Sequence, residues 1–410
     1  MNPSNVSLGT FNNLGIAPKL LEILDRQKFI HPTPIQQQSI PIAIEGKDLI
    51  GIAQTGTGKT LAFGIPMLQR IAKSSGQIKG LVILPTRELA VQVDETLKKI
   101  GSSVGLKTAI LIGGESINRQ IKSLRQNPHI IIATPGRMID HLENTKLNLS
   151  RVGILVLDEA DRMLDMGFAP QIKKILDRVP TKRQTLLFSA TMPNEIVKIA
   201  HSYMSLPLRV EVAPSGTAVS TVTQEVVFVD RGEKLSQLRS VLSEYKGSVL
   251  VFTRTKYGAQ KLARSVRDMG HSATEIHSNR SLNQRLHALE GFKVGKYRVL
   301  VATDIAARGI DVSGIEVVVN YDLPAMAEDY VHRIGRTARA GRSGHAISFA
   351  TPDQRGEVRS IERLIRQTLR TSATPSASNV REVSPPNRRH ERPRNKRRFS
   401  DGQGYFMKRR

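Results

Sequence analysis

The chain contains no cysteine, no tryptophan and no long hydrophobic run. Without cysteine it can form neither a disulfide framework nor a thiolate metal site, which fits a reducing cytosol. Apolar runs such as 154–157 and 249–252 are far shorter than the ~20 residues that span a bilayer. The first eleven residues lack a charged segment followed by an apolar one. We therefore expect no signal peptide, no membrane segment and a cytoplasmic location.

Aromatic residues and negative charge are also scarce. Aromatic residues make up 4% of the chain, and a platform on which successive bases stack needs exposed rings, so base stacking is not expected to dominate binding. The 61 Lys and Arg residues exceed the 36 Asp and Glu residues, which gives a formal net charge of +25. Such an excess indicates a polyanionic partner, with nucleic acid as the leading candidate. A basic surface that serves only solubility is the alternative.

Short runs of Val, Ile and Leu alternate with amphipathic stretches along the chain. Such runs are typical of strands that are buried on both faces of a parallel sheet between helices. The predicted strands are 81–84, 130–133, 154–157, 185–188, 249–252, 299–302 and 317–319. The pattern predicts an α/β fold, and a length of 410 residues suits two domains and a tail.

Two strand ends in the first half of the chain are echoed in the second half. LVILPT at 81–86 resembles VLVFT at 249–253, and IIIATPGR at 130–137 resembles VLVATDIA at 299–306. Such echoes are typical of a duplicated unit. We expect both halves to have the same fold, a mainly parallel sheet flanked by helices.

The predicted lobes are residues 1–212 and 222–370. Between them, 213–221 is small, polar and broken by a proline and a glycine, which predicts a linker. Near the end of the second lobe, apolar residues at helical spacing in 358–369 predict a last helix that packs on this lobe. Residues 371–410 are rich in Ser, Pro, Asn and Arg, which predicts a disordered basic tail that binds nucleic acid.

AQTGTGKT at 53–60 fits the spacing of a phosphate-binding loop, although Ala53 stands where the general pattern has glycine. The glycines let backbone N–H groups cradle phosphates, Lys59 reaches the β and γ oxygens, and the Thr60 hydroxyl coordinates Mg²⁺. A helix that starts there adds its positive end. A purely structural glycine turn is the alternative, but it does not require lysine followed by threonine. The predicted nucleotide-binding residues are Ala53, Gln54, Thr55, Gly56, Thr57, Gly58, Lys59 and Thr60.

The strand at 154–157 delivers Asp158 and Glu159 at its carboxyl end, where parallel α/β sheets bind ligands. Asp158 can hold Mg²⁺ directly or through water, and Glu159 can orient and deprotonate the attacking water. An acidic cluster of this kind is often only a solvated loop. Together with the phosphate-binding loop, it predicts a site for ATP and Mg²⁺.

With these two motifs the sequence resembles the DEAD-box RNA helicases over roughly 11–345. KFIHPTPIQ at 28–36 resembles the adenine-reading Q motif of that family, with Phe11 at its isolated aromatic position. The resemblance implies that Gln36 hydrogen-bonds the adenine edge and that Phe29 stacks on the base. A carboxamide offers adenine both a donor and an acceptor. Without the neighbouring motifs, Phe29 would be interpreted as a core aromatic.

Further segments follow in the order of the family's motifs: PTRELA, a glycine pair, TPGR, SAT, VFTRTK, ATDIAARGID and HRIGRTAR. A glycine pair or a Pro-Gly dipeptide alone indicates only a turn. In this order, the resemblance implies that the first three segments contact the sugar–phosphate backbone of RNA and that SAT links hydrolysis to closure of the lobes. The expected RNA-binding residues are Pro85, Thr86, Arg87, Gly113, Gly114, Thr134, Pro135, Gly136, Arg137, Arg285 and Thr303.

In the second lobe, the resemblance makes Arg336 and Arg339 the arginine fingers that reach across the cleft to the γ-phosphate, and Asp311 the contact to the ribose. An arginine finger contributes about 10³–10⁵ in rate, so hydrolysis should require closure of the two lobes. The residues expected to couple the lobes are Asp161, Ser189, Thr191 and His332.

SLNQR at 281–285 departs from the family because Leu282 stands where glutamine is usual, while Arg285 is kept. The departure concerns one contact to RNA or between the lobes and leaves the ATP chemistry untouched. GGESINRQ at 113–120 and DRMLDMGF at 161–168 are most similar to the bacterial RhlE-like subgroup.

The expected function is an ATP-dependent RNA helicase with ATP and Mg²⁺ as cofactors. RNA-stimulated hydrolysis of ATP to ADP and phosphate would drive local unwinding of RNA duplexes and remodelling of RNA–protein complexes. ATP and RNA would each bind across both lobes, so that each raises the affinity for the other. RNA would be held with little sequence specificity, because contacts to phosphates and sugars do not report sequence. Ribosomal and RNA-degradation assemblies are both possible settings.

Three other readings remain at this point. The substrate could be DNA, bound by a helicase of related fold. The chain could also be an RNA clamp or scaffold that uses ATP as a switch, although Lys59, Glu159, Arg336 and Arg339 argue for turnover. Lastly, it could be a basic RNA-binding protein that acts chiefly through its tail.

Overall fold

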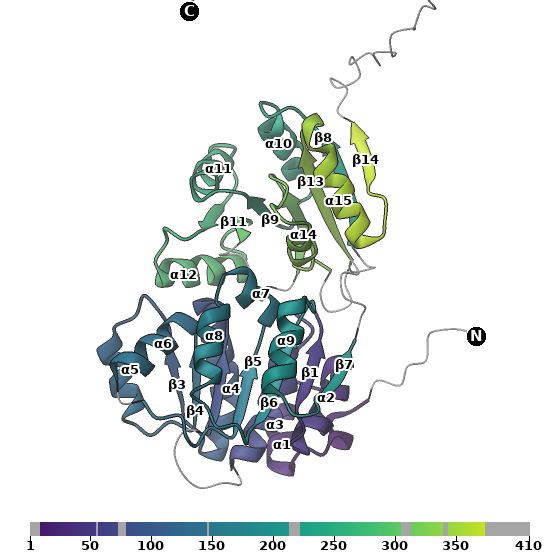
Figure 1. Ribbon diagram of the computed structural model, residues 1–410. Coiled ribbons are helices and arrows are strands. Elements are labelled where there is room, and N and C mark those ends of the chain that lie inside the picture. Colours follow the sequence, from purple (N-terminus) through teal and green to yellow (C-terminus); the bar gives the residue numbers. More distant parts are fainter. Residues whose placement is uncertain are drawn as a thin grey trace, which may run out of the picture.

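Two seven-stranded sheets, with every strand pair parallel, form the two lobes of the computed structural model (Figure 1). The structure describes residues 9–54, 56–72, 79–145, 147–212, 222–304, 312, 314–338 and 343–373. Within these residues, no helix is both long and apolar enough to cross a membrane. The predicted linker, 213–221, lies outside the described residues.

The first sheet has the strand order β3-β4-β2-β5-β6-β1-β7. Its strands are β1 (Leu49–Ile52), β2 (Gly80–Ile83), β3 (Thr108–Leu111), β4 (Ile130–Ala133), β5 (Ile154–Leu157), β6 (Gln184–Ser189) and β7 (Leu208–Glu211). The central strands consist of buried β-branched and aliphatic residues, which suit a sheet covered on both faces.

The second sheet repeats this order as β10-β11-β9-β12-β13-β8-β14. Its strands are β8 (Val222–Phe228), β9 (Ser248–Thr253), β10 (Ala273–Ile276), β11 (Val299–Thr303), β12 (Ile315–Asn320), β13 (Gly344–Ala350) and β14 (Arg370–Ala373). The two echoed strand ends occupy equivalent places, because β2 corresponds to β9 and β4 to β11. The predicted duplication of the fold is therefore confirmed.

Helices cover both faces of each sheet. Those of the first lobe are α1 (Pro18–Arg26), α2 (Pro34–Ile44), α3 (Lys59–Ala72), α4 (Arg87–Gly101), α5 (Ile117–Leu124), α6 (Pro135–Asn144), α7 (Ala160–Asp165), α8 (Ala169–Leu176) and α9 (Asn194–Tyr203). Those of the second lobe are α10 (Lys234–Glu244), α11 (Lys256–Asp268), α12 (Leu282–Lys293), α14 (Ala327–Ile334) and α15 (Arg355–Ile365). Short 3₁₀ turns lie at Phe11–Leu14, Ser102–Val104 and Pro352–Gln354.

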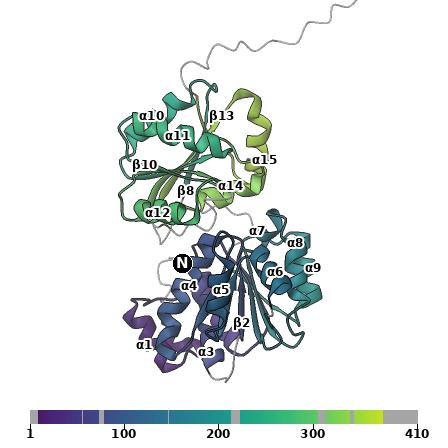
Figure 2. The same ribbon diagram turned by 90° about the vertical axis from the view of Figure 1, so that its left-hand side faces the viewer.

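Alternate residues of a strand enter opposite cores. In β2, Val82 belongs to the core under α3 and α4, whereas Leu81 and Ile83 belong to the core under α8 and α9. Figure 2 shows these two helical layers on opposite sides of the first sheet. In the second lobe, Val249 and Val251 face α10 and α11, and the opposite face of the sheet packs on α12, α14 and α15.

The last predicted helix is α15, and it packs on the second lobe as expected. It ends at Ile365, before Arg366 with φ of +53°, so Leu369 is buried from a loop rather than from the helix. The tail boundary also needs correction, because β14 continues to Ala373 and pairs with β8. Composition missed these three residues because backbone pairing at a sheet edge does not need apolar side chains. Residues 374–410 lie outside the described residues.

Asp48 holds together three segments at the start of β1. Its carboxylate accepts hydrogen bonds from the backbone N–H of Thr185, at the beginning of β6, and of Ser205, before β7, each at 2.7 Å. Asp48 is buried, so these amides have little access to water. The side chain therefore replaces backbone partners that the neighbouring strands do not supply.

Replacing Asp48 by alanine should lower the free energy of unfolding of the first lobe by about 2–5 kcal/mol, because each orphaned amide costs about 1–3 kcal/mol. Asp48→Asn keeps one acceptor oxygen and should fall between the alanine variant and the wild type. The midpoint of urea unfolding measures both effects. An alanine variant within about 0.5 kcal/mol of the wild type, the range of ordinary surface changes, would contradict this role.

Candidate functional site

The loop after β1 enters α3 through two glycines with positive φ, Gly56 at +87° and Gly58 at +88°. A Cβ at Gly58 would lie 2.3 Å from Nε2 of Gln36, so a side chain there would displace Gln36. Lys59 begins the 14-residue helix α3, and its buried Nζ donates to the carbonyl oxygen of Ala53 at 3.1 Å. The loop thus leads into a helix N-terminus with a buried lysine, an arrangement that binds phosphate. Thr55 lies outside the described residues.

Gln36 connects the segment 28–36 to this loop. Its Oε1 accepts from the backbone N–H of Thr33 at 2.9 Å, and its Nε2 donates to the carbonyl oxygen of Gly58 at 2.9 Å. Phe29 is 40% exposed, so the interpretation as a core aromatic is wrong and its ring is accessible to a base. Phe11 packs into the core of the first lobe.

The two carboxylates after β5 are both buried. Oδ1 of Asp158 lies 3.8 Å from Nζ of Lys59 and accepts the backbone N–H of Glu159 at 2.9 Å. Glu159 has φ of +51° and ψ of +50°, a left-handed conformation that costs a residue with a Cβ about 1–3 kcal/mol and is concentrated at functional sites. Its carboxylate forms an ion pair with Arg162 of α7.

Burial and neighbouring charges shift the pKa values of these two groups in opposite directions. Burial raises the pKa of Asp158 to about 6, against the opposing effect of Lys59. Burial also acts to raise the pKa of Glu159, but Arg162, Lys59 and Arg336 together lower it to about 2. Glu159 is therefore fully ionised near neutral pH.

The end of α14 brings the second lobe to this cluster. Arg336 is 2% exposed, its Nε donates to the carbonyl oxygen of His332 at 3.2 Å, and its charge lowers the pKa of Glu159 across the cleft. A Cβ on Gly335 would lie 3.9 Å from Oε1 of Gln54, so this turn lies against the phosphate loop. Arg339 and Asp311 lie outside the described residues.

Asp161 links the acidic motif to the segment after β6. Its Oδ2 accepts the backbone N–H and the hydroxyl of Thr191 at 2.8 and 2.9 Å, and its backbone N–H donates to Oγ of Ser189 at 3.2 Å. Burial lowers the pKa of His332 to about 4, and the carboxylate of Asp161 opposes this shift only in part. The four residues expected to couple the lobes thus form a continuous group around Asp161.

A pocket of about 440 Å³, which we call the interlobe pocket, lies between the lobes. It is lined by Pro85, Thr86, Arg87, Glu88, Gly113, Thr134, Gly136, Arg137, Asp140, Met166, Phe168, Ser278, Arg280 and Arg285. Most of the residues that the sequence assigns to RNA are therefore brought together. Gly114 lies beside Arg87, Pro135 is buried in α6, and Thr303 ends β11 half-buried outside this lining.

Comparisons with known proteins agree with this geometry. Residues 33–199 match the model of the DEAD/DEAH box helicase family, and 233–341 match the helicase conserved C-terminal domain. The chain is 45% identical to the ATP-dependent rRNA helicase RRP3 of Debaryomyces hansenii, over 90% of this chain and 77% of RRP3. It is 44% identical to the DEAD-box ATP-dependent RNA helicase CshA of Geobacillus kaustophilus, over 90% of this chain and 79% of CshA.

The chain belongs to the DEAD-box family of helicases. Its fold matches that of Saccharomyces cerevisiae Dbp5 bound to RNA and ADP BeF₃, with a TM-score of 0.81 and 30% identity, over 90% of this chain and 96% of that chain. The protein is an ATP-dependent RNA helicase, an enzyme that hydrolyses ATP.

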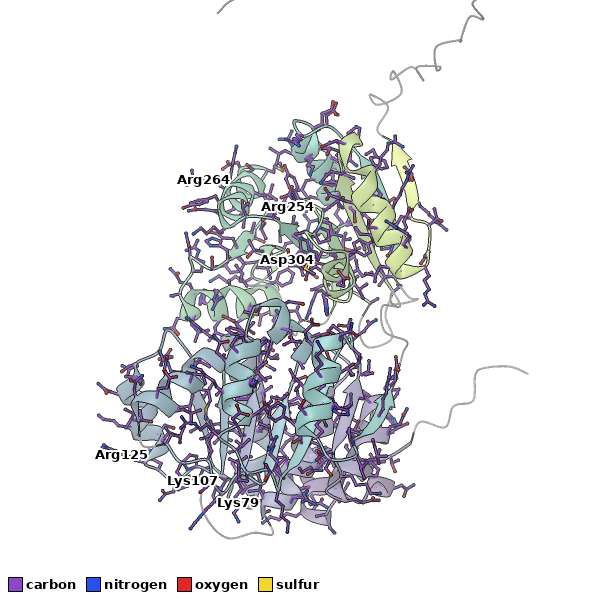
Figure 3. All side chains as sticks on the ribbon, viewed as in Figure 1. Lys79, Lys107, Arg125, Arg254, Arg264 and Asp304 are labelled. Carbon is purple, nitrogen blue, oxygen red and sulfur yellow. The ribbon has the colours of Figure 1, made fainter. Side chains whose placement is uncertain are left out.

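Positive charge is concentrated in the interlobe pocket of this helicase. Burial lowers the pKa of Arg87, and the nearby charges of Arg285 and Arg137 lower it further. Arg285 pairs with Glu88 at 2.6 Å, yet its buried Nε has no hydrogen-bond partner among the described residues. Converging guanidinium groups of this kind can form bidentate hydrogen bonds to a phosphate. Figure 3 shows further cations, Lys79, Lys107 and Arg125, at the end of the first lobe away from the second, so basic surface also extends beyond the pocket.

Gln120 is a site residue that sequence reasoning missed. Its buried carboxamide accepts from Nη1 of Arg137 at 3.0 Å, contacts Nε2 of His141 at 3.0 Å and donates to the carbonyl oxygen of Ile112 at 2.7 Å. Arg137 also donates to the carbonyl oxygen of Glu115 at 2.9 Å. Gln120 therefore holds the guanidinium group of Arg137 in place. In the sequence, its position in the GGESINRQ segment was the only indication of this role.

The helicase site contains other residues that the motifs did not assign. Arg162 lies three residues after Glu159 on the first turn of α7, a spacing that allows the ion pair. Ser278 and Arg280 come from the loop after β10, and Met166 and Phe168 follow α7. Arg280 could have been found from its position shortly before Arg285, whereas the two apolar residues carry no signal in a single sequence.

Gln120→Leu should raise the RNA concentration that gives half-maximal ATPase activity about tenfold, because Arg137 loses a charge-assisted hydrogen bond worth about 1.5–3 kcal/mol. The KM for ATP at saturating RNA should stay unchanged, since the phosphate loop is not touched. Titration of RNA against the steady-state ATPase rate measures this, with the exposed Gln126→Leu as the matched control. Equal RNA requirements in the two variants would show that Gln120 does not position Arg137.

Proposed function

We propose that ATP hydrolysis occurs where the end of α14 meets the phosphate loop, and that RNA lies in the pocket lined by Arg87, Arg137 and Arg285. The main support is the proximity of Arg336, from the second lobe, to Glu159, from the first lobe, with both side chains buried. A site divided in this way is complete only when the lobes are together. Closure, hydrolysis and RNA binding are then one coupled process.

In the ATP site, Lys59 binds the β- and γ-phosphates and Glu159 acts on the attacking water. Arg162, Lys59 and Arg336 lower the pKa of Glu159, so its carboxylate is ionised and can both orient the water and accept its proton. Arg336 and Arg339 stabilise the charge on the transferred phosphoryl group. Gln36 and Phe29 bind adenine, and Asp311 binds the ribose; the exposed ring of Phe29 supports this assignment.

Asp158 and the hydroxyl of Thr60 would hold Mg²⁺. Burial raises the pKa of Asp158 to about 6, and a divalent cation would favour its ionised form. Among the described residues there is no cluster of three acidic or histidine side chains that could form a full cage. This fits Mg²⁺, which usually takes one or two carboxylates and completes its shell with phosphate oxygens and water. When bound, the ion neutralises charge on the phosphates.

RNA would be held by its sugar–phosphate backbone. The pocket offers guanidinium groups, the hydroxyls of Thr86 and Thr134 and the backbone of Gly113 and Gly136. Gly114, Pro135 and Thr303 complete the proposed contact set. Such contacts fix the strand without reading its sequence. Dbp5 was solved with RNA bound, and the similarity of its fold supports the same substrate here.

Asp161, Ser189, Thr191 and His332 would transmit the state of the γ-phosphate to the contact between the lobes. The hydrogen bonds of Asp161 to the segment after β6 support this proposal. The lobes themselves are assigned as 1–212 and 222–373, joined by the linker at 213–221. The remaining residues, 374–410, would form the basic tail that adds grip on RNA.

The biological setting is inferred from resemblance and from composition. GGESINRQ and DRMLDMGF support the RhlE-like subgroup, and the absence of cysteine supports the cytoplasm. RRP3 is an rRNA helicase, which supports ribosomal RNA as a substrate class for this chain. RNA duplexes and RNA–protein complexes of the ribosome would then be the structures it remodels.

Glu159→Gln should reduce RNA-stimulated phosphate release at least about 100-fold, because a misoriented water loses a catalytic advantage of this size. The binding of ATP and RNA should persist. Steady-state turnover and binding of a fluorescent ATP analogue measure the two properties, with the exposed Glu143→Gln on α6 as the matched control. Turnover close to that of the wild type would remove Glu159 from the catalytic set.

A further inference from the structure

Leu282 occupies the place where the family usually has glutamine, at the first position of α12. The helix start is well defined without it. The hydroxyl of Ser281 accepts the backbone N–H of Gln284 at 3.3 Å, and the Gln284 carboxamide accepts the backbone N–H of Ser281 at 3.0 Å. Leu282 is therefore not needed to cap or start the helix, and its side chain is available for another role.

The apolar neighbours of Leu282 belong to the other lobe. The residue is 6% exposed, and it belongs to the core of the first lobe rather than to any of the second-lobe cores described above. Leu286, one turn later, packs against the same first-lobe core. Figures 1 and 2 show α12 at the underside of the second lobe against the first lobe, where it contacts α4. The burial of Leu282 thus depends on contact between the lobes.

Arg285 shares this face of α12, because residues three and four apart lie side by side on a helix. It pairs with Glu88 of α4 at 2.6 Å, with side chains that are 11% and 3% exposed. Both residues line the RNA pocket. Leu282 and Leu286 therefore flank a buried ion pair between the lobes that forms one wall of the pocket.

We propose that Leu282 is a positioning residue for RNA binding, which seats α12 on the first lobe and so places Arg285 beside Glu88 in the RNA pocket. The proposal rests on the function proposed above. A glutamine buried in the same apolar surroundings would need hydrogen-bond partners, whereas leucine gains from burial alone. This apolar contact is made by protein side chains alone, so it contributes to closure before any RNA has bound.

The apolar contact of Leu282 with the first lobe should make closure of the two lobes less dependent on bound RNA. Replacing Leu282 by glutamine should make the closed state about tenfold less favourable, which corresponds to about 1.4 kcal/mol. The basal ATPase rate without RNA should fall about tenfold, and the RNA concentration for half-maximal activity should rise about tenfold. The rate at saturating RNA should remain that of the wild type, because RNA then restores closure.

The experiment compares Leu282→Gln, Leu282→Met, Leu282→Ala and the wild type in ATPase titrations with RNA, using the full chain. Leu206→Gln serves as the matched control, since Leu206 is 92% exposed. We expect the methionine variant to behave as the wild type, the alanine variant to be intermediate and the control to be unchanged. If the glutamine variant fails to fold, the order of wild type, methionine and alanine carries the same test.

Two results would overturn the proposal. One is a glutamine or alanine variant with wild-type basal rate and RNA requirement; the other is a methionine variant as impaired as the glutamine variant. A wild-type protein whose ATPase activity does not respond to RNA would instead contradict the proposed function. The two failures are therefore distinguishable in the same titration.

Discussion

The buried charges of the cleft require both lobes. Lys59, Asp158, Glu159 and Arg162 lie on the first lobe with almost no access to water, and Arg336 is buried beside them from the second. Each buried ion costs several kcal/mol unless an opposite charge compensates it. The cluster contains cations from both lobes, and a bound triphosphate would add negative charge at its centre. The occupancy of the site and the contact between the lobes are thus linked by electrostatics, and the same contact between the lobes forms the pocket in which we propose that RNA binds.

The parallel sheets explain why so many functional residues meet. The carboxyl ends of parallel strands lie along one edge, so the phosphate loop after β1, Asp158 after β5 and Ser189 at the end of β6 become neighbours despite their distance in sequence. The left-handed backbone conformation of Glu159 and the hydrogen bonds of Asp161 then fix the positions of these two carboxylates at this edge of the sheet. The second sheet repeats the topology but contributes Arg336 and Arg285 in place of a second phosphate loop.

The sequence predicted those parts of the fold in which local pattern and tertiary packing agree. Strands such as β4 and β5, which are buried on both faces, were predicted with their bounds. A short run of Val, Ile and Leu between amphipathic stretches is typical of such a strand. Seven of the described strands were not predicted, and all four edge strands, β3, β7, β10 and β14, are among them. Backbone pairing stabilises edge strands such as β14, and part of β7 is exposed, so their side chains carry a weaker apolar pattern. The interior strands β1, β8 and β13 were also not predicted. Motif order alone named most of the residues that the fold brings together in the pocket between the lobes. Gln120 and Arg162 were missed because their importance lies in the partners they contact, Arg137 and Glu159, which a single sequence does not reveal. Leu282 was noticed only as a departure, and the fold gives it a location between the lobes.

If the ATP site is shared between the lobes, the variant Arg336→Lys should lose most of its ATPase activity. The variant keeps the positive charge, but an ammonium cannot reproduce the planar fork of a guanidinium. Single-turnover hydrolysis at saturating ATP and RNA should fall by about 10³ or more, the contribution of an arginine finger, while the first lobe still binds nucleotide. A hydrolysis rate within a few-fold of the wild type would contradict a shared ATP site, because Arg336 would then be only a buried structural residue.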